Sequence, residues 1–300
     1  MKRILITGMN SFIGKSLVEY LENYNTQSGE ETYQITCISQ RRKDWLSMDF
    51  AGYDTILDVT GISRVDEKKV SYEQEEEYYE VNYKLAYMTA EKAKKEGVRQ
   101  FIYLSSILVY GEPGQPEVIT KDTKPAPANI YGKSKLLAEE KLKELNDLQF
   151  QVGIIRLPTV YGPYAENGYK LLSRWAGKLP IIPTIPAEKS MIYIENLCEF
   201  LRLLIEAEEG GVYFPQNANQ TCVARMLEEI RTVQGKKTYK CGIMDFGIKL
   251  LIRMPGRCGK LARKVFAGQV YEGSMSVALG DYQVVDFPES IRRTEGMRKW

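Results

Sequence analysis

Histidine is absent from the 300-residue chain, and this absence excludes several kinds of enzyme. Without an imidazole the protein can be neither a Ser-His-Asp hydrolase nor a Cys-His protease, and it can have no histidine-ligated metal site. The usual proton carrier near neutral pH is missing as well. Proton transfer by this protein therefore requires another side chain.

Other residue types and patterns are scarce. The five cysteines, at positions 37, 198, 222, 241 and 258, show no paired spacing, so we expect reduced thiols in a cytoplasmic protein and no Cys₄ metal site. No apolar run approaches the roughly 20 residues that span a bilayer. The apolar stretch near the start is too short for a signal-peptide core and predicts a buried strand. A net charge of +2 gives no overall indication of nucleic-acid or membrane binding.

What is present fits a globular α/β protein. Apolar residues make up 44% of the chain and charged residues 27%, which is enough to build a core. Short apolar strands alternate with helices up to about residue 157, which predicts a Rossmann-type doubly wound parallel sheet with a smaller C-terminal α/β substrate lobe. We expect a dinucleotide-binding domain at 1–165, rejoined by 190–212, and the substrate lobe at 166–189 and 213–300.

A glycine turn follows the first predicted strand. In Thr7-Gly8-x-x-Ser11-x-x-Gly14, Gly8 permits a tight turn and Gly14 lets a helix pack closely on the strand. The helix start, Ser11 to Gly14, includes Phe12 and Ile13 and would bind a pyrophosphate. Ser11 stands where a glycine usually allows the closest approach to phosphate, and its hydroxyl can donate a hydrogen bond instead. The alternative is a capped turn that binds no ligand.

The residues after the second predicted strand bear on which dinucleotide is bound. Ser39-Gln40-Arg41-Arg42-Lys43 contains three cations and no acid, which favours the 2′-phosphate of NADP over the ribose of NAD. A basic surface loop is the competing interpretation. Asp49 and Phe50, just before the next strand, are expected to flank the adenine.

Tyr131 and Lys135 are four residues apart in a predicted helix and so project from the same face. An ammonium beside a phenol favours the phenolate, so we expect a lowered pKa that makes Tyr131 the acid/base group. Ser106 ends the preceding predicted strand. Each of these features alone is also common in proteins without this chemistry.

Together these segments resemble the extended short-chain dehydrogenases/reductases, in particular the nucleotide-sugar epimerase, dehydratase and reductase branch that includes UDP-glucose 4-epimerase. The resemblance also covers Val81-Asn82, residues 104–111, Arg156-Leu-Pro-Thr-Val-Tyr-Gly-Pro163, residues 191–197 and a closing helix at 287–294. It implies that Ser106 holds the substrate oxygen, that Tyr131 is the acid/base and that Lys135 binds the nicotinamide ribose. It places Pro158 near the nicotinamide.

The resemblance also implies the reaction: hydride transfer at C4 of a nucleotide-diphosphate sugar, in polysaccharide or deoxysugar biosynthesis. Dehydrating relatives carry acids directly after the serine, whereas Ile107 and Leu108 follow Ser106, which disfavours dehydration. The basic segment at 41–43 favours a 4-keto reductase with exchangeable NADPH. A 4-epimerase with retained NAD, a redox-silent NADP-binding regulatory protein and a reductase for a non-sugar ketone remain alternatives.

Further expectations concern substrate and partners. Tyr110, Thr159 and Lys189 are predicted to contact the nucleotide sugar, with Lys189 as a point charge for phosphate. The segment 248–266 mixes six cations with large apolar residues, a pattern that can lie on an anionic membrane, although two short helices with a cationic outer face explain it more simply. The resemblance implies a homodimer formed by helices near 74–96 and 128–145, no nucleic-acid partner and no metal.

Overall fold

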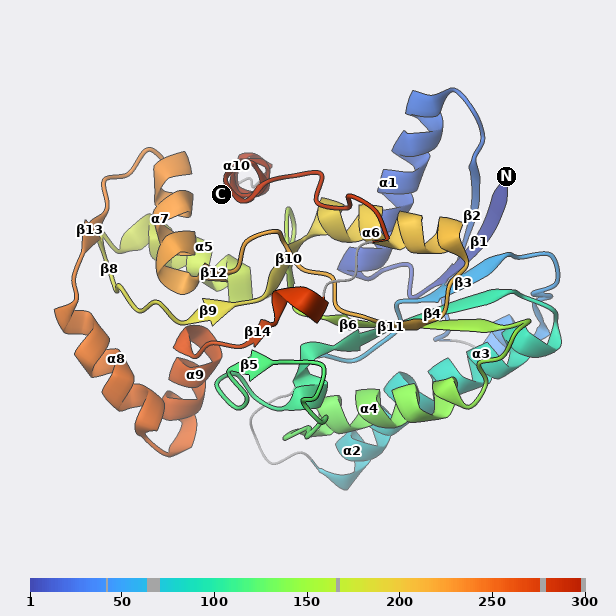
Figure 1. The fold of residues 1–300 in the computed structure, drawn as a ribbon, viewed down its shortest axis with the longest axis horizontal. Coiled ribbons are helices and arrows are strands. Elements are labelled where there is room, and N and C mark those ends of the chain that lie inside the picture. The colour runs from blue at the N-terminus through green and yellow to red at the C-terminus, as the bar shows by residue number, and fades with distance from the viewer. Residues whose placement is uncertain (42, 64–70, 166–167, 276–278, 298–300) are drawn as a thin grey trace.

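A six-stranded parallel sheet organises the chain in the computed structural model, which describes residues 1–41, 43–63, 71–165, 168–275 and 279–297 (Figure 1). The strand order is β11-β6-β4-β3-β1-β2. Its strands are β1 (Lys2–Thr7), β2 (Tyr33–Ile38), β3 (Thr55–Asp58), β4 (Gln100–Ser106), β6 (Gln151–Leu157) and β11 (Gly211–Tyr213). The chain runs outward in opposite directions from β1, so the sheet has a topological switch point where ligands bind in such folds. The predicted fold class is confirmed.

Helices cover both faces of the sheet, as a doubly wound fold requires. On one face lie α1 (Phe12–Ser28) and α6 (Ile194–Ala207), and on the other α3 (Leu85–Lys95) and α4 (Ile130–Lys143) (Figure 1). Successive side chains of β1 point to opposite faces of the sheet. Ile4 and Ile6 therefore belong to the core on the α1 side, and Leu5 belongs to the core on the α4 side. All three side chains are fully buried.

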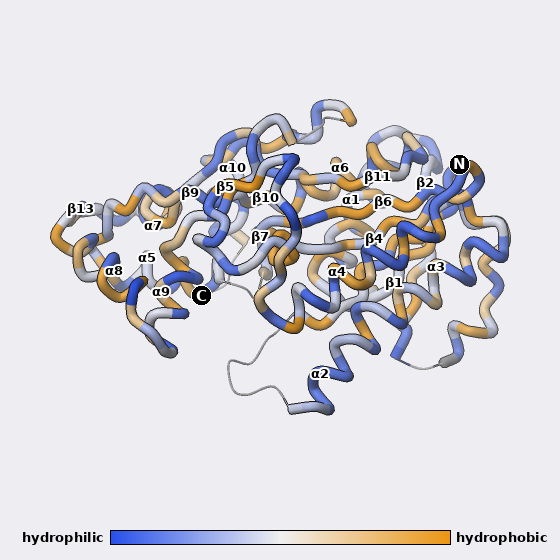
Figure 2. Tube along the Cα trace, turned by 60° about the horizontal axis from the view of Figure 1, so that its bottom comes forward, coloured by the Kyte–Doolittle hydropathy of each residue, from blue (hydrophilic) through white to orange (hydrophobic). Residues whose placement is uncertain are grey.

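The helix predicted near residues 74–96 is divided into three parts. It consists of α2 (Tyr72–Tyr79), a π-helical turn η2 (Glu80–Lys84) and α3. Figure 2 shows α2 as a hydrophilic segment that stands away from the sheet. The π-helical turn contains Asn82, which is fully buried. Such turns widen a helix by one residue and occur often at functional sites.

Short elements, most of them from the C-terminal half, form a lobe beside the sheet. Its helices are α5 (Gly168–Lys178), α7 (Val223–Val233), α8 (Ile243–Arg253), α9 (Gly256–Phe266) and α10 (Phe287–Gly296). Four two-stranded pairs complete it: β7 (Thr159–Tyr161) with β10 (Met191–Tyr193), β9 (Glu188–Lys189) with β12 (Thr221–Cys222), β8 (Ile181–Ile182) with β13 (Tyr239–Lys240), and β5 (Val118–Ile119) with β14 (Val270–Tyr271). Between these pairs the chain returns to the main sheet through α6 and β11. The domain boundaries given above remain a prediction.

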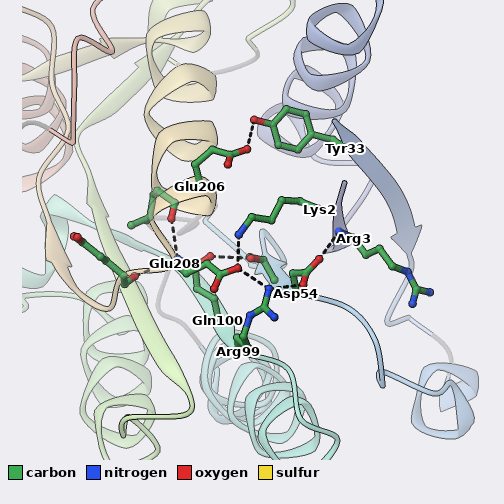
Figure 3. A network of polar contacts seen from close by, with 11 residues as sticks. Lys2, Arg3, Tyr33, Asp54, Arg99, Gln100, Glu206 and Glu208 are labelled. Atoms are coloured by element: carbon green, nitrogen blue, oxygen red, sulfur yellow. Dashed lines mark hydrogen bonds and ion pairs between the residues drawn. The ribbon is translucent and has the colours of Figure 1, made fainter. Parts of the chain in front are cut away.

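A network of polar side chains connects the amino ends of the central strands (Figure 3). Arg99 donates to Asp54 at 2.6 Å and to Glu208 at 2.7 Å. Lys2 pairs with the same Glu208 carboxylate. Arg99 is about half exposed, so these pairs contribute little stability individually. These pairs connect the start of β1 to the start of β4 and the end of α6. The residues discussed below lie at the opposite, carboxyl ends of the strands.

Candidate active site

Ser106 lies at the carboxyl end of β4, where the strand passes into the 3₁₀ turn η3 (Ile107–Tyr110). Its hydroxyl oxygen accepts a hydrogen bond from the Leu108 N–H at 3.2 Å and so caps the turn. The side chain keeps 8% of its surface exposed. The cap fixes the serine rotamer, and its hydroxyl hydrogen is free to bond with another group.

Tyr131 is brought beside Ser106 by close packing of α4 on η3. A Cβ atom on Gly132 would lie only 2.5 Å from the Leu108 carbonyl oxygen, so this approach requires glycine. Asn129 caps the helix through a hydrogen bond from the Gly132 N–H at 2.9 Å. Tyr131 therefore sits in the first helical turn, near enough to Ser106 for the serine hydroxyl to act on the pKa of the phenol. The predicted serine–tyrosine pair is assembled.

The expected lowering of the Tyr131 pKa is wrong for this structure. Burial raises the pKa of the phenol, and this effect outweighs that of the neighbouring Ser106 hydroxyl, which lowers it. The nearby phenol of Tyr78 raises it further. The physical reason is that removal of water disfavours the phenolate more than the neighbouring groups favour it. Tyr131 is therefore protonated at neutral pH.

Lys135 lies one helical turn further along α4 and is 3% exposed. Its Nζ atom donates to the Leu104 carbonyl oxygen at 2.8 Å and lies 4.4 Å from the centre of the Tyr103 ring. Burial lowers its pKa to about 8, although the carboxylates of Asp58 and Glu139 act in the opposite direction. The ammonium is thus held under β4 by a carbonyl and an aromatic face.

Two residues near Lys135 were not assigned a role from the sequence. Asn82 accepts a hydrogen bond from the Ile62 N–H at 2.8 Å and donates to the Ser134 hydroxyl at 3.0 Å. It therefore ties the loop after β3 to the helix that carries Tyr131 and Lys135. A Cβ atom on Gly61, in that loop, would lie 3.3 Å from Lys135 Nζ. The sequence did contain one indication of a special role for Asn82, because asparagine favours caps and turns and here lies inside a predicted helix.

Asp58 is the second such residue. It ends β3 and is 1% exposed. One carboxylate oxygen accepts from the Thr7 hydroxyl at 2.5 Å and from the Thr60 N–H at 3.0 Å, while Oδ2 has no hydrogen-bond partner in the described part of the chain. Burial raises its pKa, and the charge of Lys135 acts in the opposite direction. A buried acid thus lies within electrostatic reach of the site lysine.

The glycine turn has the geometry of a phosphate-binding cradle. Gly8 has φ +66°, and a Cβ atom there would lie 2.9 Å from the Thr60 backbone nitrogen. A Cβ atom on Gly14 would lie 3.1 Å from the Gly8 carbonyl oxygen. The position of Gly8 therefore requires glycine, and the small size of Gly14 lets the helix pack closely on the turn. The cradle fits a dinucleotide pyrophosphate.

The start of α1 is also suited to an anion. Ser11 is its N-cap and accepts from the Gly14 N–H at 3.0 Å, so its hydroxyl hydrogen remains available to a phosphate oxygen. The N–H groups of Phe12 and Ile13 have no acceptor within the helix because they belong to its first turn. No acidic side chain occupies that turn. The positive end of the helix dipole is thus left for a phosphate.

The predicted adenosine contacts are brought together only in part. Arg41 is exposed after β2, whereas Arg42 lies outside the described residues. Asp49 is exposed and accepts from the Ala51 N–H at 2.8 Å. Phe50 has no exposed surface and stacks on Trp45 within the core, so its side chain is not available to an adenine ring. An apolar residue near a strand was equally compatible with a core position, which the sequence alone did not distinguish.

Gln40 occupies the position where a carboxylate would be expected for NAD. It accepts a hydrogen bond from the Thr60 hydroxyl at 2.9 Å and donates to the Thr89 hydroxyl at 2.6 Å. It connects the end of β2 to the Thr60 loop and so to the glycine cradle. Pro158 is buried between β6 and β7.

The predicted substrate residues have different environments. Tyr110 is 3% exposed, and its hydroxyl accepts from Arg156 Nη1 at 2.6 Å, so it belongs to a buried network and does not face solvent. Thr159 is exposed at the start of β7. Lys189 Nζ donates to the Lys264 carbonyl oxygen at 2.6 Å. Burial, with a smaller effect of the Lys264 charge, lowers the pKa of Lys189 to about 8.

A doubly wound sheet with a serine, tyrosine and lysine clustered at the carboxyl ends of its strands is typical of extended short-chain dehydrogenases/reductases. The chain belongs to the NAD dependent epimerase/dehydratase family, whose model matches residues 4–214. The resemblance identified from the sequence is confirmed, as is a nicotinamide dinucleotide as the cofactor class of the family.

Individual relatives support the same assignment. The chain is 29% identical over 221 residues to the N-acetyl-alpha-D-glucosaminyl-diphospho-ditrans,octacis-undecaprenol 4-epimerase of Escherichia coli O157:H7, covering 69% of this chain and 64% of the relative. It is 31% identical over 189 residues to the UDP-glucose 4-epimerase of Vibrio cholerae, covering 60% and 57% respectively. The match thus spans less than two thirds of each of these relatives.

Solved structures share the fold over nearly the whole chain. The UDP-glucuronic acid 4-epimerase from Bacillus cereus, in complex with NAD, superposes with a TM-score of 0.72 over 98% of both chains at 17% identity. Among the described residues, no helix is both long and apolar enough to cross a membrane. The same residues contain no group of three or more acidic or cysteine side chains placed to hold a metal ion.

Proposed function

We propose that this protein is an NADPH-dependent reductase that converts a 4-keto group of a nucleotide-diphosphate sugar into a hydroxyl. The observation that carries the proposal is the placement of Ser106 beside a Tyr131 phenol whose pKa is raised by burial. A phenol that remains protonated at neutral pH is suited to donate a proton to a carbonyl oxygen. Oxidation of a hydroxyl would need the phenolate instead.

The chain's own residues have separate tasks in this reaction. Ser106 binds the carbonyl oxygen, and Tyr131 delivers the proton to it as the carbonyl carbon is reduced. The dinucleotide, when bound, supplies the hydride. Lys135 and the positive end of α4 stabilise the phenolate that remains on Tyr131. Ser106 is held by its cap and Lys135 by Leu104, so neither needs to reorganise during the step.

The choice of NADPH is supported by the end of β2. Gln40 there is occupied with Thr60 and Thr89, and the exposed Arg41 follows it. An amide engaged with two hydroxyls offers no carboxylate to a ribose 2′-hydroxyl, whereas a guanidinium can form a two-pronged contact with a 2′-phosphate.

A second candidate is a 4-epimerase with retained NAD, and it is favoured by the names of the two sequence relatives reported above. For this candidate the group that carries the sugar could be a nucleotide or a polyprenol, because one relative is named for a polyprenol-linked diphosphate sugar. Both candidates use Ser106, Tyr131 and Lys135 and differ in whether hydride returns to the same sugar. For either candidate we expect a homodimer formed through α2, α3 and α4.

The products distinguish these candidates. The purified protein is incubated with UDP- and dTDP-linked 4-keto sugars and NADPH, and separately with UDP-glucose and UDP-N-acetylglucosamine without added cofactor. We expect one NADPH consumed for each 4-hydroxy sugar formed, and no dinucleotide that copurifies. Interconversion of C4 epimers without net consumption of cofactor, together with tightly held NAD, establishes the epimerase instead. Binding of NADPH with no reaction on any sugar indicates the regulatory protein.

A further inference from the structure

We propose that the helical hairpin formed by α8 and α9 docks this protein on the surface of an anionic lipid bilayer. The hairpin comprises residues 243–266 and lies at one end of the long axis of the molecule, opposite β1 and β2 (Figure 1). This surface lies outside the matched family region, which ends at residue 214. The proposal does not depend on which reaction the protein catalyses.

The hairpin exposes an apolar stripe on α8. Ile243, Phe246 and Leu250 are 86%, 77% and 57% exposed. At 100° per residue these three side chains fall within an arc of about 60° on the helix surface. No residue of α8 is buried, although the helix is largely apolar. Exposed large apolar side chains that gather on one face mark an interaction surface.

The orientation of the stripe is fixed by one contact to the rest of the chain and by the turn of the hairpin itself. Asp245, on the opposite side of α8, accepts a hydrogen bond from the Thr184 N–H at 2.8 Å and another from its hydroxyl. A Cβ atom on Gly259 would lie 1.8 Å from the Met254 carbonyl oxygen, so α9 turns back tightly against the end of α8. Arg263 closes this corner by donating to the Ile252 carbonyl oxygen at 2.6 Å. The stripe therefore points outward on a fixed support.

The charge of the hairpin is complementary to anionic lipid. It carries six cations and a single acid, so its charge of about +5 exceeds the +2 of the whole chain. The single acid is Asp245, which is already engaged with Thr184. Five cations are exposed, and none of them pairs with a carboxylate in the described part of the chain: Lys249, Arg253, Arg257, Lys260 and Lys264. An apolar stripe beside unpaired cations is the pattern of helices that lie in a membrane interface.

The same charge disfavours a second copy of the chain as the occupant. A two-fold symmetric contact through this face would place the two sets of cations against each other. Lys249 and Arg253 follow the stripe along one side of α8, at the level where lipid phosphates would lie if the stripe entered the acyl region. An anionic lipid surface can accept both the apolar stripe and the cations beside it.

Vesicle binding by the full chain tests the proposal. Sucrose-loaded vesicles of phosphatidylcholine alone, or with 30% phosphatidylglycerol, are sedimented with the wild-type protein and with a Phe246→Ser, Leu250→Ser double variant. We expect binding that needs phosphatidylglycerol, weakens as salt rises from about 50 to 500 mM, and falls at least tenfold in the double variant. The matched control is Leu148→Ser, since Leu148 is 99% exposed but lies outside the hairpin. It should bind as the wild type does.

A charge variant separates the two contributions. Lys249→Gln with Arg253→Gln should bind severalfold more weakly and show a smaller salt dependence, whereas Lys121→Gln with Lys124→Gln should not. Circular dichroism melts check that all variants remain folded, and Ile243→Ser replaces the double variant if that one unfolds. The proposal is overturned if the wild type ignores the vesicles, binds both compositions equally, or binds as well after Phe246 and Leu250 are replaced. It is equally overturned if sedimentation velocity shows a dimer that this replacement dissociates.

Discussion

The Nζ atom of Lys135 donates a hydrogen bond to the Leu104 carbonyl oxygen, 2.8 Å away, and this contact holds the site lysine beneath the end of β4. Ser106 follows Leu104 by two residues on the same strand. The contact therefore sets the position of the ammonium relative to the serine that is proposed to bind substrate oxygen. Burial at this position disfavours the charged form of the lysine and lowers its pKa to about 8.

The first prediction concerns the pH dependence of stability. The pKa of Lys135 is about 8 in the folded protein, whereas an unfolded lysine titrates near 10.5. Between these values the unfolded state binds more protons, so wild-type stability rises with pH. Relative to Lys135→Met, we expect a rise of about 3 kcal/mol across this window. Urea unfolding at pH 7.5 and 10.5 measures it, and parallel pH profiles of the two proteins would contradict it.

Asp58 should hold the Lys135 pKa up, since its carboxylate favours the ammonium. In Asp58→Asn the amide oxygen can still accept from Thr7 and Thr60, and its nitrogen replaces Oδ2, which has no hydrogen-bond partner among the described residues. We therefore expect a folded protein in which the alkaline loss of kcat/KM occurs at lower pH than in the wild type. The pH profile of kcat/KM measures this shift. An unmoved alkaline limb shows that Asp58 does not act on Lys135.

Arg156 and Glu139 form a buried ion pair behind the site, with a distance of 2.6 Å between Nη2 and Oε2. Glu139 also accepts from Ser105, the neighbour of Ser106. Glu139→Gln leaves the guanidinium without a counter-charge, and we expect a loss of about 3–5 kcal/mol in the free energy of unfolding. The control is Glu144→Gln, which removes the exposed pair with Lys141 and should change stability by less than about 1 kcal/mol. Equal effects in urea unfolding would contradict the structural role.

Arg41 should select the phosphorylated dinucleotide. Loss of one charge-assisted contact to a 2′-phosphate costs about 1.5–3 kcal/mol, so Arg41→Ala should lower kcat/KM for NADPH about 10- to 100-fold. The value for NADH provides the internal control, because that cofactor has no 2′-phosphate, and it should change little. A parallel decline with both cofactors would remove the basis for choosing NADPH.

The sequence was sufficient for the parts of this protein that depend on local pattern. Alternating short apolar strands and helices predict the sheet. The spacing of Tyr131 and Lys135 is a property of any helix. The tight turn at Gly8 and the close packing at Gly14 were predicted from the small size of glycine, and the structure has both.

The remaining features depend on contacts between distant segments. The direction of the Tyr131 pKa depends on how much water is removed from the phenol, which spacing along a helix does not encode. Phe50 was assigned to the adenine, but it packs on Trp45 in the core. Asp58 and Asn82 acquire their relation to the site only when β3, the π-helical turn and α4 come together. Tertiary burial decides each of these cases.

The measurement that tests the central claim most directly is the rate of NADPH oxidation with a 4-keto nucleotide sugar, in the wild type and in Tyr131→Phe. The substitution removes one hydroxyl and keeps the ring. The account predicts measurable turnover in the wild type and a loss of about 10²- to 10⁴-fold in kcat for the variant, with NADPH binding unchanged. Equal rates in the two proteins would contradict the assignment of Tyr131 as the proton donor.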